Sequence, residues 1–195
     1  MNRNNAKRVS EEFAIDEAHY WNAAPKVFEA TNGVYSFRLH AELTAEHAEV
    51  DSEAMVSFFE HLFANENSPQ YVLTGAKKFL QGCAQLGKTI ILTLGENENQ
   101  SRRASESELS TMAHQVLVTQ GDKGDEVHNY LGSFSGKLIV MDDTERHLDA
   151  VRRRFPGCLA LHAAICTDKP TLNDANVRVA SYDEAMARIR EFLDL

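Results

Sequence analysis

Length, composition and charge already exclude several classes of protein. The chain has 195 residues, of which 43% are hydrophobic and four are proline, so it fits one globular domain with a sizeable core. A formal net charge of −9 argues against nucleic acid or an anionic membrane surface as a partner. No apolar run is long enough to span a bilayer. The three cysteines are odd in number and widely spaced, so we expect reduced thiols in a cytoplasmic protein.

The first 70 residues contain mostly helical patterns. Residues 1–12 are polar, and we expect them to be flexible. Residues 52–63 have apolar side chains at helical spacing, after Asp51 or Ser52 as the capping residue. Residues 34–39 fit a strand or part of a helix equally well.

Strands alternate with helices from Tyr71 onward. Helical patterns fill residues 75–86, 102–112, 125–131 and 182–193, and an amphipathic segment follows residue 143. Five short apolar runs between them are typical of strands: residues 89–93, 115–119, 138–141, 159–166 and 177–179. This alternation predicts an α/β fold, with right-handed βαβ units in a three-layer α/β/α sandwich around a mainly parallel sheet.

Two adjacent acids, Asp142 and Asp143, end the apolar run at residues 138–141. Ligands of parallel sheets bind at the carboxyl ends of the strands, where these carboxylates would emerge. Neighbouring carboxylates repel each other unless a cation compensates, and Mg²⁺ prefers such oxygen ligands. Alternatively, Asp142 caps the next helix and Asp143 lies in its first turn. The stretch alone leaves both interpretations open.

Two further polar residues follow neighbouring strands of the expected sheet. Thr93 ends one strand, and Lys123 lies in the glycine-flanked loop after the next. A hydroxyl can donate to a phosphoryl oxygen, and a lysine can neutralise phosphate charge. Because the carboxyl ends of parallel strands meet at one edge, we expect Thr93, Lys123 and Asp142 to lie together.

In order and spacing, these motifs resemble those of the haloacid dehalogenase-like (HAD) hydrolase superfamily. Residues 90–95 resemble its second motif, Lys123 its third, and the pair Asp142-Asp143 its fourth. The resemblance covers residues 71–195 well and the first 70 residues poorly. It implies a Rossmann-like, HAD-like sheet and Mg²⁺-dependent phosphatase chemistry on a small phosphorylated metabolite through an aspartyl intermediate.

The first motif of the superfamily, Asp-x-Asp-x-Thr after a strand, has no full match. The best match places residues 13–15 on the strand and Asp16 at the nucleophile, with Ala18 in place of the acid that moves the proton. A second register places residues 34–39 on the strand and Arg38 at the nucleophile. The first register fits better, because the helical residues that follow would then form a small insert.

The resemblance assigns a role to each candidate residue. It implies that Asp16 attacks and holds Mg²⁺ together with Asp142 and Asp143. Thr93 and Lys123 would bind phosphate, and Lys123 would also orient the nucleophile. We expect a single domain over residues 1–195, with residues 22–70 as a small helical, cap-like insert. The alternative is a HAD-fold protein with impaired catalysis and a binding or regulatory role, because Ala18 cannot transfer a proton.

Overall fold

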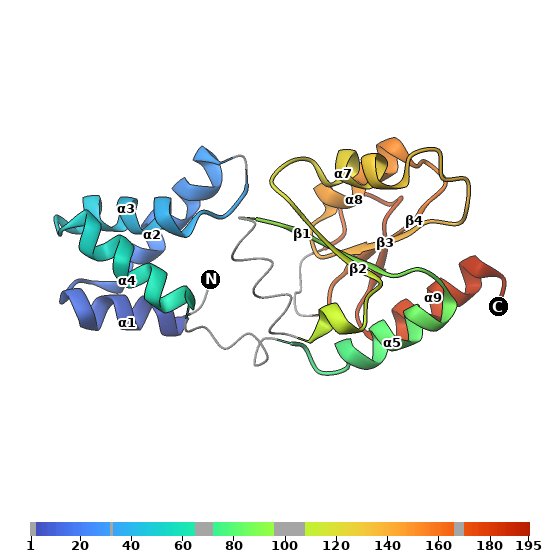
Figure 1. Cartoon of the computed structure of the whole chain (residues 1–195), viewed down its shortest axis with the longest axis horizontal. Coiled ribbons are helices and arrows are strands. Elements are labelled where there is room, and N and C mark those ends of the chain that lie inside the picture. The colour runs from blue at the N-terminus through green and yellow to red at the C-terminus, as the bar shows by residue number, and fades with distance from the viewer. Residues whose placement is uncertain (1–2, 32, 65–71, 96–107, 166–169) are drawn as a thin grey trace.

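The chain forms a helical bundle followed by an α/β body, each with its own hydrophobic core (Figure 1). The computed structural model describes residues 3–31, 33–64, 72–95, 108–165 and 170–195. No helix in these ranges is long and apolar enough to cross a membrane.

Four helices make up the bundle: α1 (Arg3–Phe13), α2 (Glu17–Ala30), α3 (Phe37–Ala48) and α4 (Ser52–Ala64). Side chains cap three of them, because the first backbone N–H groups of a helix have no partner within it. Asp16 accepts a hydrogen bond from the backbone N–H of Ala18 at 2.8 Å, and Asp51 accepts one from that of Ala54 at 2.7 Å. Ser36 likewise caps α3.

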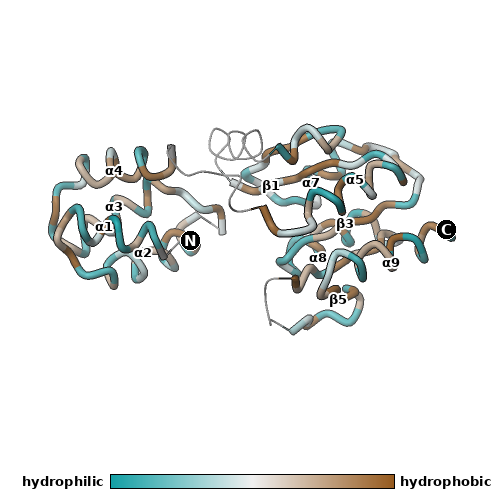
Figure 2. The backbone as a smooth tube through the Cα atoms, turned by 90° about the horizontal axis from the view of Figure 1, so that it is seen from below, coloured by the Kyte–Doolittle hydropathy of each residue, from teal (hydrophilic) through white to brown (hydrophobic). Residues whose placement is uncertain are grey.

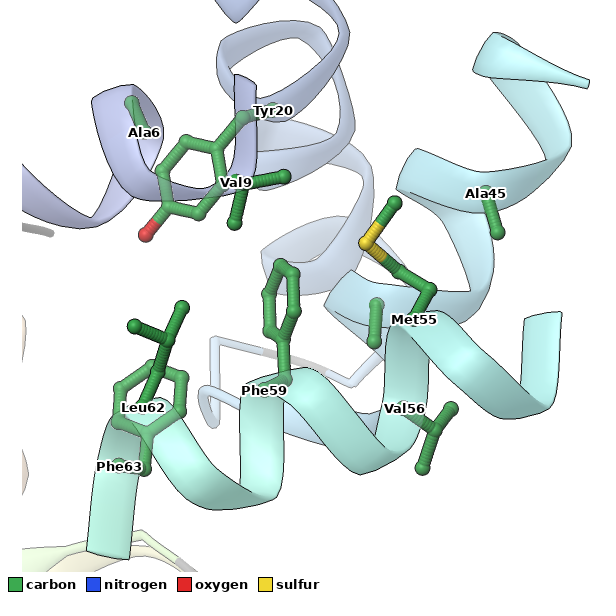
Figure 3. Close-up of a cluster of buried hydrophobic side chains, with 10 residues drawn as sticks. Ala6, Val9, Tyr20, Ala45, Met55, Val56, Phe59, Leu62 and Phe63 are labelled. Carbon is green, nitrogen blue, oxygen red and sulfur yellow. The ribbon is translucent and has the colours of Figure 1, made fainter. Parts of the chain in front are cut away.

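Aromatic and aliphatic side chains fill the centre of the bundle (Figure 3). Tyr20, Met55 and Phe59 are at most 1% exposed, and Ala6 and Val9 of α1 are fully buried beside them. The expectation of a flexible stretch at residues 1–12 is therefore wrong from Arg3 onward. The charged side chains of Lys7, Arg8, Glu11 and Glu12 are exposed, whereas Ala6 and Val9 are buried together with the polar Asn5.

Neither segment proposed for a first strand is a strand. Phe13 is the last residue of α1, and Phe37 begins α3. Both side chains pack against the bundle core, as does Ile15. The apolar residues that suggested a strand therefore pack against a helical core. The first strand in the described part of the chain begins at Ile90.

The α/β body confirms the alternation expected from residue 71 onward. Its helices are α5 (Ala76–Leu86), α7 (Lys123–Leu131), α8 (Glu145–Arg154) and α9 (Tyr182–Leu193). Its strands are β1 (Ile90–Leu94), β2 (Gln115–Thr119), β3 (Ile139–Asp142), β4 (Leu159–Ala163) and β5 (Val177–Val179). The helix expected at residues 102–112 lies partly outside the described ranges, and Leu109–Thr111 is a single 3₁₀ turn.

All strand pairs are parallel, but the strands form two sheets. In the first, β1 pairs with β2, from Ile90 opposite Gln115 to Leu94 opposite Thr119. In the second, β4 lies between β3 and β5. Among the described residues β1 and β3 form no ladder with each other, so the expected sheet is interrupted between them.

Helices cover the strands on both sides, with α7 and α8 above them and α5 and α9 below in Figure 1. The apolar stretches of the tube in Figure 2 follow the strands between these helices. In one layer Phe79 of α5 stacks on Tyr182 of α9, with ring centroids 5.0 Å apart. In the other, α7 and α8 approach so closely that Gly124 lies against the backbone of Ala150. The body is therefore a three-layer α/β/α sandwich.

Replacing Gly124 by alanine tests this close approach. A Cβ at Gly124 would lie 2.2 Å from the carbonyl oxygen of Ala150, so the helices would have to separate. We expect Gly124→Ala to lower the free energy of unfolding by about 1–3 kcal/mol in urea titrations. Gly157→Ala is the control, because nothing lies within 4 Å of a Cβ there. Equal losses in the two variants would contradict the packing described for α7 and α8.

Candidate functional site

An ion pair joins the ends of two strands that belong to different sheets. Asp122 caps α7 after β2 and accepts a hydrogen bond from the N–H of Gly124 at 2.8 Å, which fixes Lys123 at the helix start. Asp142 is the last residue of β3. The Nζ of Lys123 donates to Oδ2 of Asp142 at 2.7 Å, and the two side chains are only 12% and 10% exposed.

The other carboxylate oxygen of Asp142 has partners from α8. It accepts from the backbone N–H of Thr144 at 2.9 Å and lies 3.1 Å from Nδ1 of His147. The His147 ring is also mostly buried, and its Nε2 atom has no hydrogen-bond partner within the described ranges. This histidine is not among the candidate residues predicted from the sequence. The available signal was its position, five residues after Asp142 in the first turn of an amphipathic helix.

These partners keep Asp142 ionised. Burial acts to raise its pKa, but the hydrogen bond from His147 and the charge of Lys123 outweigh burial, and the pKa lies below its ordinary value. The repulsion expected between two adjacent acids is thus compensated within the protein itself, by Lys123 and His147.

Asp143 has a different environment from Asp142. It is exposed, and its one described contact is a long hydrogen bond of 3.4 Å from the hydroxyl of Thr144. Its oxygens are available to a cation, whereas those of Asp142 are shared with Lys123 and His147. No group of three or more His, Cys, Asp or Glu side chains in the described ranges could hold a metal ion. A Mg²⁺ ion here would therefore take Asp143, a shared oxygen of Asp142, and further oxygens from phosphate or water.

The remaining candidates lie in different parts of the chain. Thr93 is half-buried near the carboxyl end of β1, opposite Val118 of β2. Asp16 is exposed and caps α2 in the helical bundle. Figure 1 shows the connection between α1 and α2 at the end of the bundle that faces away from the strands. The structure therefore brings Lys123 and Asp142 into contact and places Asp16 on a different element from the one expected.

Thiols do not replace the carboxylate as a nucleophile. Burial raises the pKa of Cys83 to about 11 and also raises that of Cys158. Both thiols are therefore protonated at neutral pH and weakly nucleophilic. Cys166 lies outside the described residues.

One contact of the bundle with the α/β body lies next to the acid pair. The guanidinium of Arg146, in the first turn of α8, packs against Gly33 in the loop between α2 and α3. A Cβ at Gly33 would lie 2.7 Å from Nη1 of Arg146, and the positive φ of 86° also favours glycine there. Gly33 therefore contacts the first turn of α8, three residues after Asp143.

Solved structures with the same architecture are haloacid dehalogenase-like hydrolases. One from Burkholderia xenovorans has a TM-score of 0.75 at 16% identity, over 93% of this chain and 87% of its own. One from Xanthomonas campestris has a TM-score of 0.66 at 14% identity, over 97% of this chain and 82% of its own. A dehalogenase with an intermediate complex has a TM-score of 0.64 at 12% identity, over 95% of this chain and 88% of its own. No protein-family model and no curated protein matches the sequence. The chain therefore has the haloacid dehalogenase-like fold.

Replacing the two acids one at a time separates their roles. Asp142→Asn leaves the mostly buried Lys123 without its partner, so we expect a loss of roughly 3 kcal/mol in unfolding free energy at pH 7. Asp143→Asn, on the surface, should stay within about 0.5 kcal/mol of the wild type.

The pH dependence gives an independent check. The folded-state pKa of Asp142 is lowered, so its stabilising contribution is present above the ordinary aspartate pKa near 4 and is lost as pH falls through the folded-state value. The gap between wild type and Asp142→Asn should therefore shrink below about pH 4. A gap that stays constant from pH 7 to pH 2 would contradict the ionised state of Asp142.

Proposed function

We propose that this protein binds a small phosphorylated molecule together with Mg²⁺ at the carboxyl edge of its strands, and does not hydrolyse it. The observation that supports this proposal is the environment of the acid pair. Lys123 holds Asp142 as an ionised anchor, while Asp143 next to it presents an exposed carboxylate whose one described hydrogen bond, from the Thr144 hydroxyl, is long.

Each residue has a defined part in binding. Asp143, with the shared oxygen of Asp142, would hold the Mg²⁺, which neutralises phosphate charge when bound. Lys123 has two ammonium protons besides the one on Asp142, and these can be donated to a phosphoryl oxygen. The hydroxyl of Thr93, at the carboxyl end of β1, is a further donor on the same edge.

Binding without hydrolysis follows from the position of Asp16. An aspartyl intermediate needs a carboxylate beside the phosphate, and Asp16 instead caps a helix of the bundle. Ala18 also replaces the acid that would protonate the leaving group, a contribution typically worth about 10²–10⁴-fold in rate. A phosphate-ester hydrolase remains the second candidate, because two of the similar solved structures are named hydrolases.

Thermal unfolding with Mg²⁺ and inorganic phosphate, alone and together, tests the binding site. A ligand at ten times its Kd raises the unfolding free energy by about 1.4 kcal/mol. We expect the wild type to reach this shift only with both ligands present. Asp143→Asn should lose it, whereas Asp174→Asn, which changes an exposed acid elsewhere, should keep it. The absence of any shift at millimolar concentrations in the wild type would overturn the proposal.

An aryl phosphate distinguishes binding from hydrolysis. Its leaving group is a weak base, so it needs little help from a general acid. With Mg²⁺ present, we expect the wild type to release p-nitrophenol from p-nitrophenyl phosphate no faster than Asp143→Asn does. Turnover that disappears in both Asp143→Asn and Asp16→Asn would instead establish the hydrolase and the role of Asp16.

A further inference from the structure

A histidine lies in the centre of the helical bundle. His40, in α3, is completely buried. Three aromatic rings surround it, with centroids 4.3 Å (Tyr20), 5.6 Å (Tyr35) and 5.3 Å (Phe59) from that of the imidazole. The ordinary pKa of histidine allows a change of charge at mildly acidic pH. The surroundings of His40 therefore decide what such a charge does to the bundle.

Both ring nitrogens of His40 have hydrogen-bond partners that suit the neutral ring. Nε2 lies 2.8 Å from the backbone carbonyl oxygen of Tyr20, which can only accept, so Nε2 carries the proton. Nδ1 lies 2.7 Å from the hydroxyl of Tyr35, which can donate to an unprotonated nitrogen. A second proton, on Nδ1, would face the proton of this hydroxyl. One neutral ring thus joins α2, α3 and the loop between them.

The described charged side chains of the bundle lie at its surface, away from His40. On α3 itself, Arg38 pairs with Glu42 on the outer side, and Glu46 is exposed. The charged residues of α1, α2 and α4 whose burial is described are all exposed: Lys7, Arg8, Glu11, Glu12, Glu17, Lys26, Glu29, Glu53 and Glu60. The other histidines, His19, His47 and His61, cannot supply a negative charge.

A proton on His40 would therefore have no described anion beside it. The titratable groups described in contact with the ring are those of Tyr20 and Tyr35, and a tyrosine hydroxyl carries no charge at mildly acidic pH. Aromatic rings attract a buried cation less than water or a carboxylate does. The folded bundle thus accommodates the neutral ring and excludes the charged one.

The pKa of His40 agrees with this geometry. Burial lowers it from the ordinary value of 6.5, the charge of the amino terminus acts in the same direction, and the hydrogen bond to the Tyr20 carbonyl acts against both. Because the folded-state pKa is the lower one, the unfolded chain binds more protons below about pH 6.5. Stability therefore falls as the pH drops from there, and above it the contribution is complete.

The bundle can respond to this proton separately from the α/β body, because the two parts have separate hydrophobic cores. Tyr35 lies in the loop between α2 and α3, two residues after Gly33. Gly33 contacts Arg146, three residues after Asp143. The loop that the His40 ring holds is therefore also the loop that contacts the body near the acid pair.

We propose that His40 is an acid-sensitive switch: protonation of its ring opens the helical bundle, and with it the contact of Gly33 with Arg146, while the α/β body stays folded. The ring takes up one proton from solvent, and water replaces the aromatic surroundings of the charged ring. Deprotonation at neutral pH closes the bundle again. This proposal does not depend on the proposed function.

Tryptophan fluorescence and amide hydrogen exchange test the switch in the wild type. Trp21 is the one tryptophan of the chain, and its ring centroid lies 5.2 Å from that of Tyr20, so its emission reports on the bundle. We expect the urea midpoint of Trp21 emission to be lower at pH 5 than at pH 7. Over the same range the exchange protection of amides in α3 should fall about tenfold, and that of β4 should stay unchanged.

Replacing His40 by glutamine separates the switch from other effects of acid. A glutamine amide can donate to the Tyr20 carbonyl and accept from the Tyr35 hydroxyl, but it takes up no proton. We expect His40→Gln to lose the dependence on pH between pH 7 and pH 5. The control is His47→Gln, because Nε2 of His47, also in α3, lies 2.6 Å from Nζ of Lys26 and its protonation would add a charge there. The control should keep the dependence of the wild type.

Three results would overturn the proposal. The first is a wild-type bundle with the same Trp21 midpoint and α3 protection at pH 7 and pH 5. The second is a dependence on pH that disappears in His47→Gln and persists in His40→Gln. The third needs no variant, and decides the question if His40→Gln does not fold at pH 7: equal losses of protection in α3 and β4 of the wild type would show unfolding of the whole chain.

Discussion

The ion pair between Lys123 and Asp142 is the contact on which the arrangement of the α/β body depends. It joins the first residue of α7, the helix after β2, to the last residue of β3, and no backbone ladder connects these two strands. Next to Lys123, Gly124 lets α7 lie directly on the backbone of α8 at Ala150. An ion pair this far from water is a weak source of stability but a strong constraint on geometry, because either charge alone would be costly to bury. The pair therefore fixes how the two sheets meet.

The same pair gives two chemically identical neighbours different surroundings. Asp142 is ionised, buried and surrounded by donors, and it holds α8 through the N–H of Thr144. Asp143, the first residue after β3, is exposed to solvent. Of the two interpretations that the sequence leaves open, contact with the start of the next helix is therefore seen for Asp142, and ligand binding is proposed for Asp143.

The success of sequence prediction differs between the two parts of the chain. Strands such as residues 115–119 lie between clear helix signals, so their apolar runs have one interpretation, and the structure confirms them. Residues 13–15 and 34–39 are equally short and apolar, but the choice between helix and strand is made there by packing around Tyr20 and Phe59. His147 is not predicted from the sequence for a related reason. It is a partner of Asp142 because Asp142 is buried, and the spacing of residues in the sequence does not reveal burial.

The division of the described strands into two sheets explains why so much of the α/β body depends on helix contacts. In an uninterrupted sheet, backbone ladders would hold β1 to β3, and the helices would add apolar cover. Here Phe79 on Tyr182 and α7 on α8 connect the two sheets instead. Side-chain packing is less directional than a ladder, so it leaves the relative position of two sheets less strictly defined. The ion pair of Lys123 with Asp142 adds the missing directionality, because its buried charges are stable only at one distance from each other.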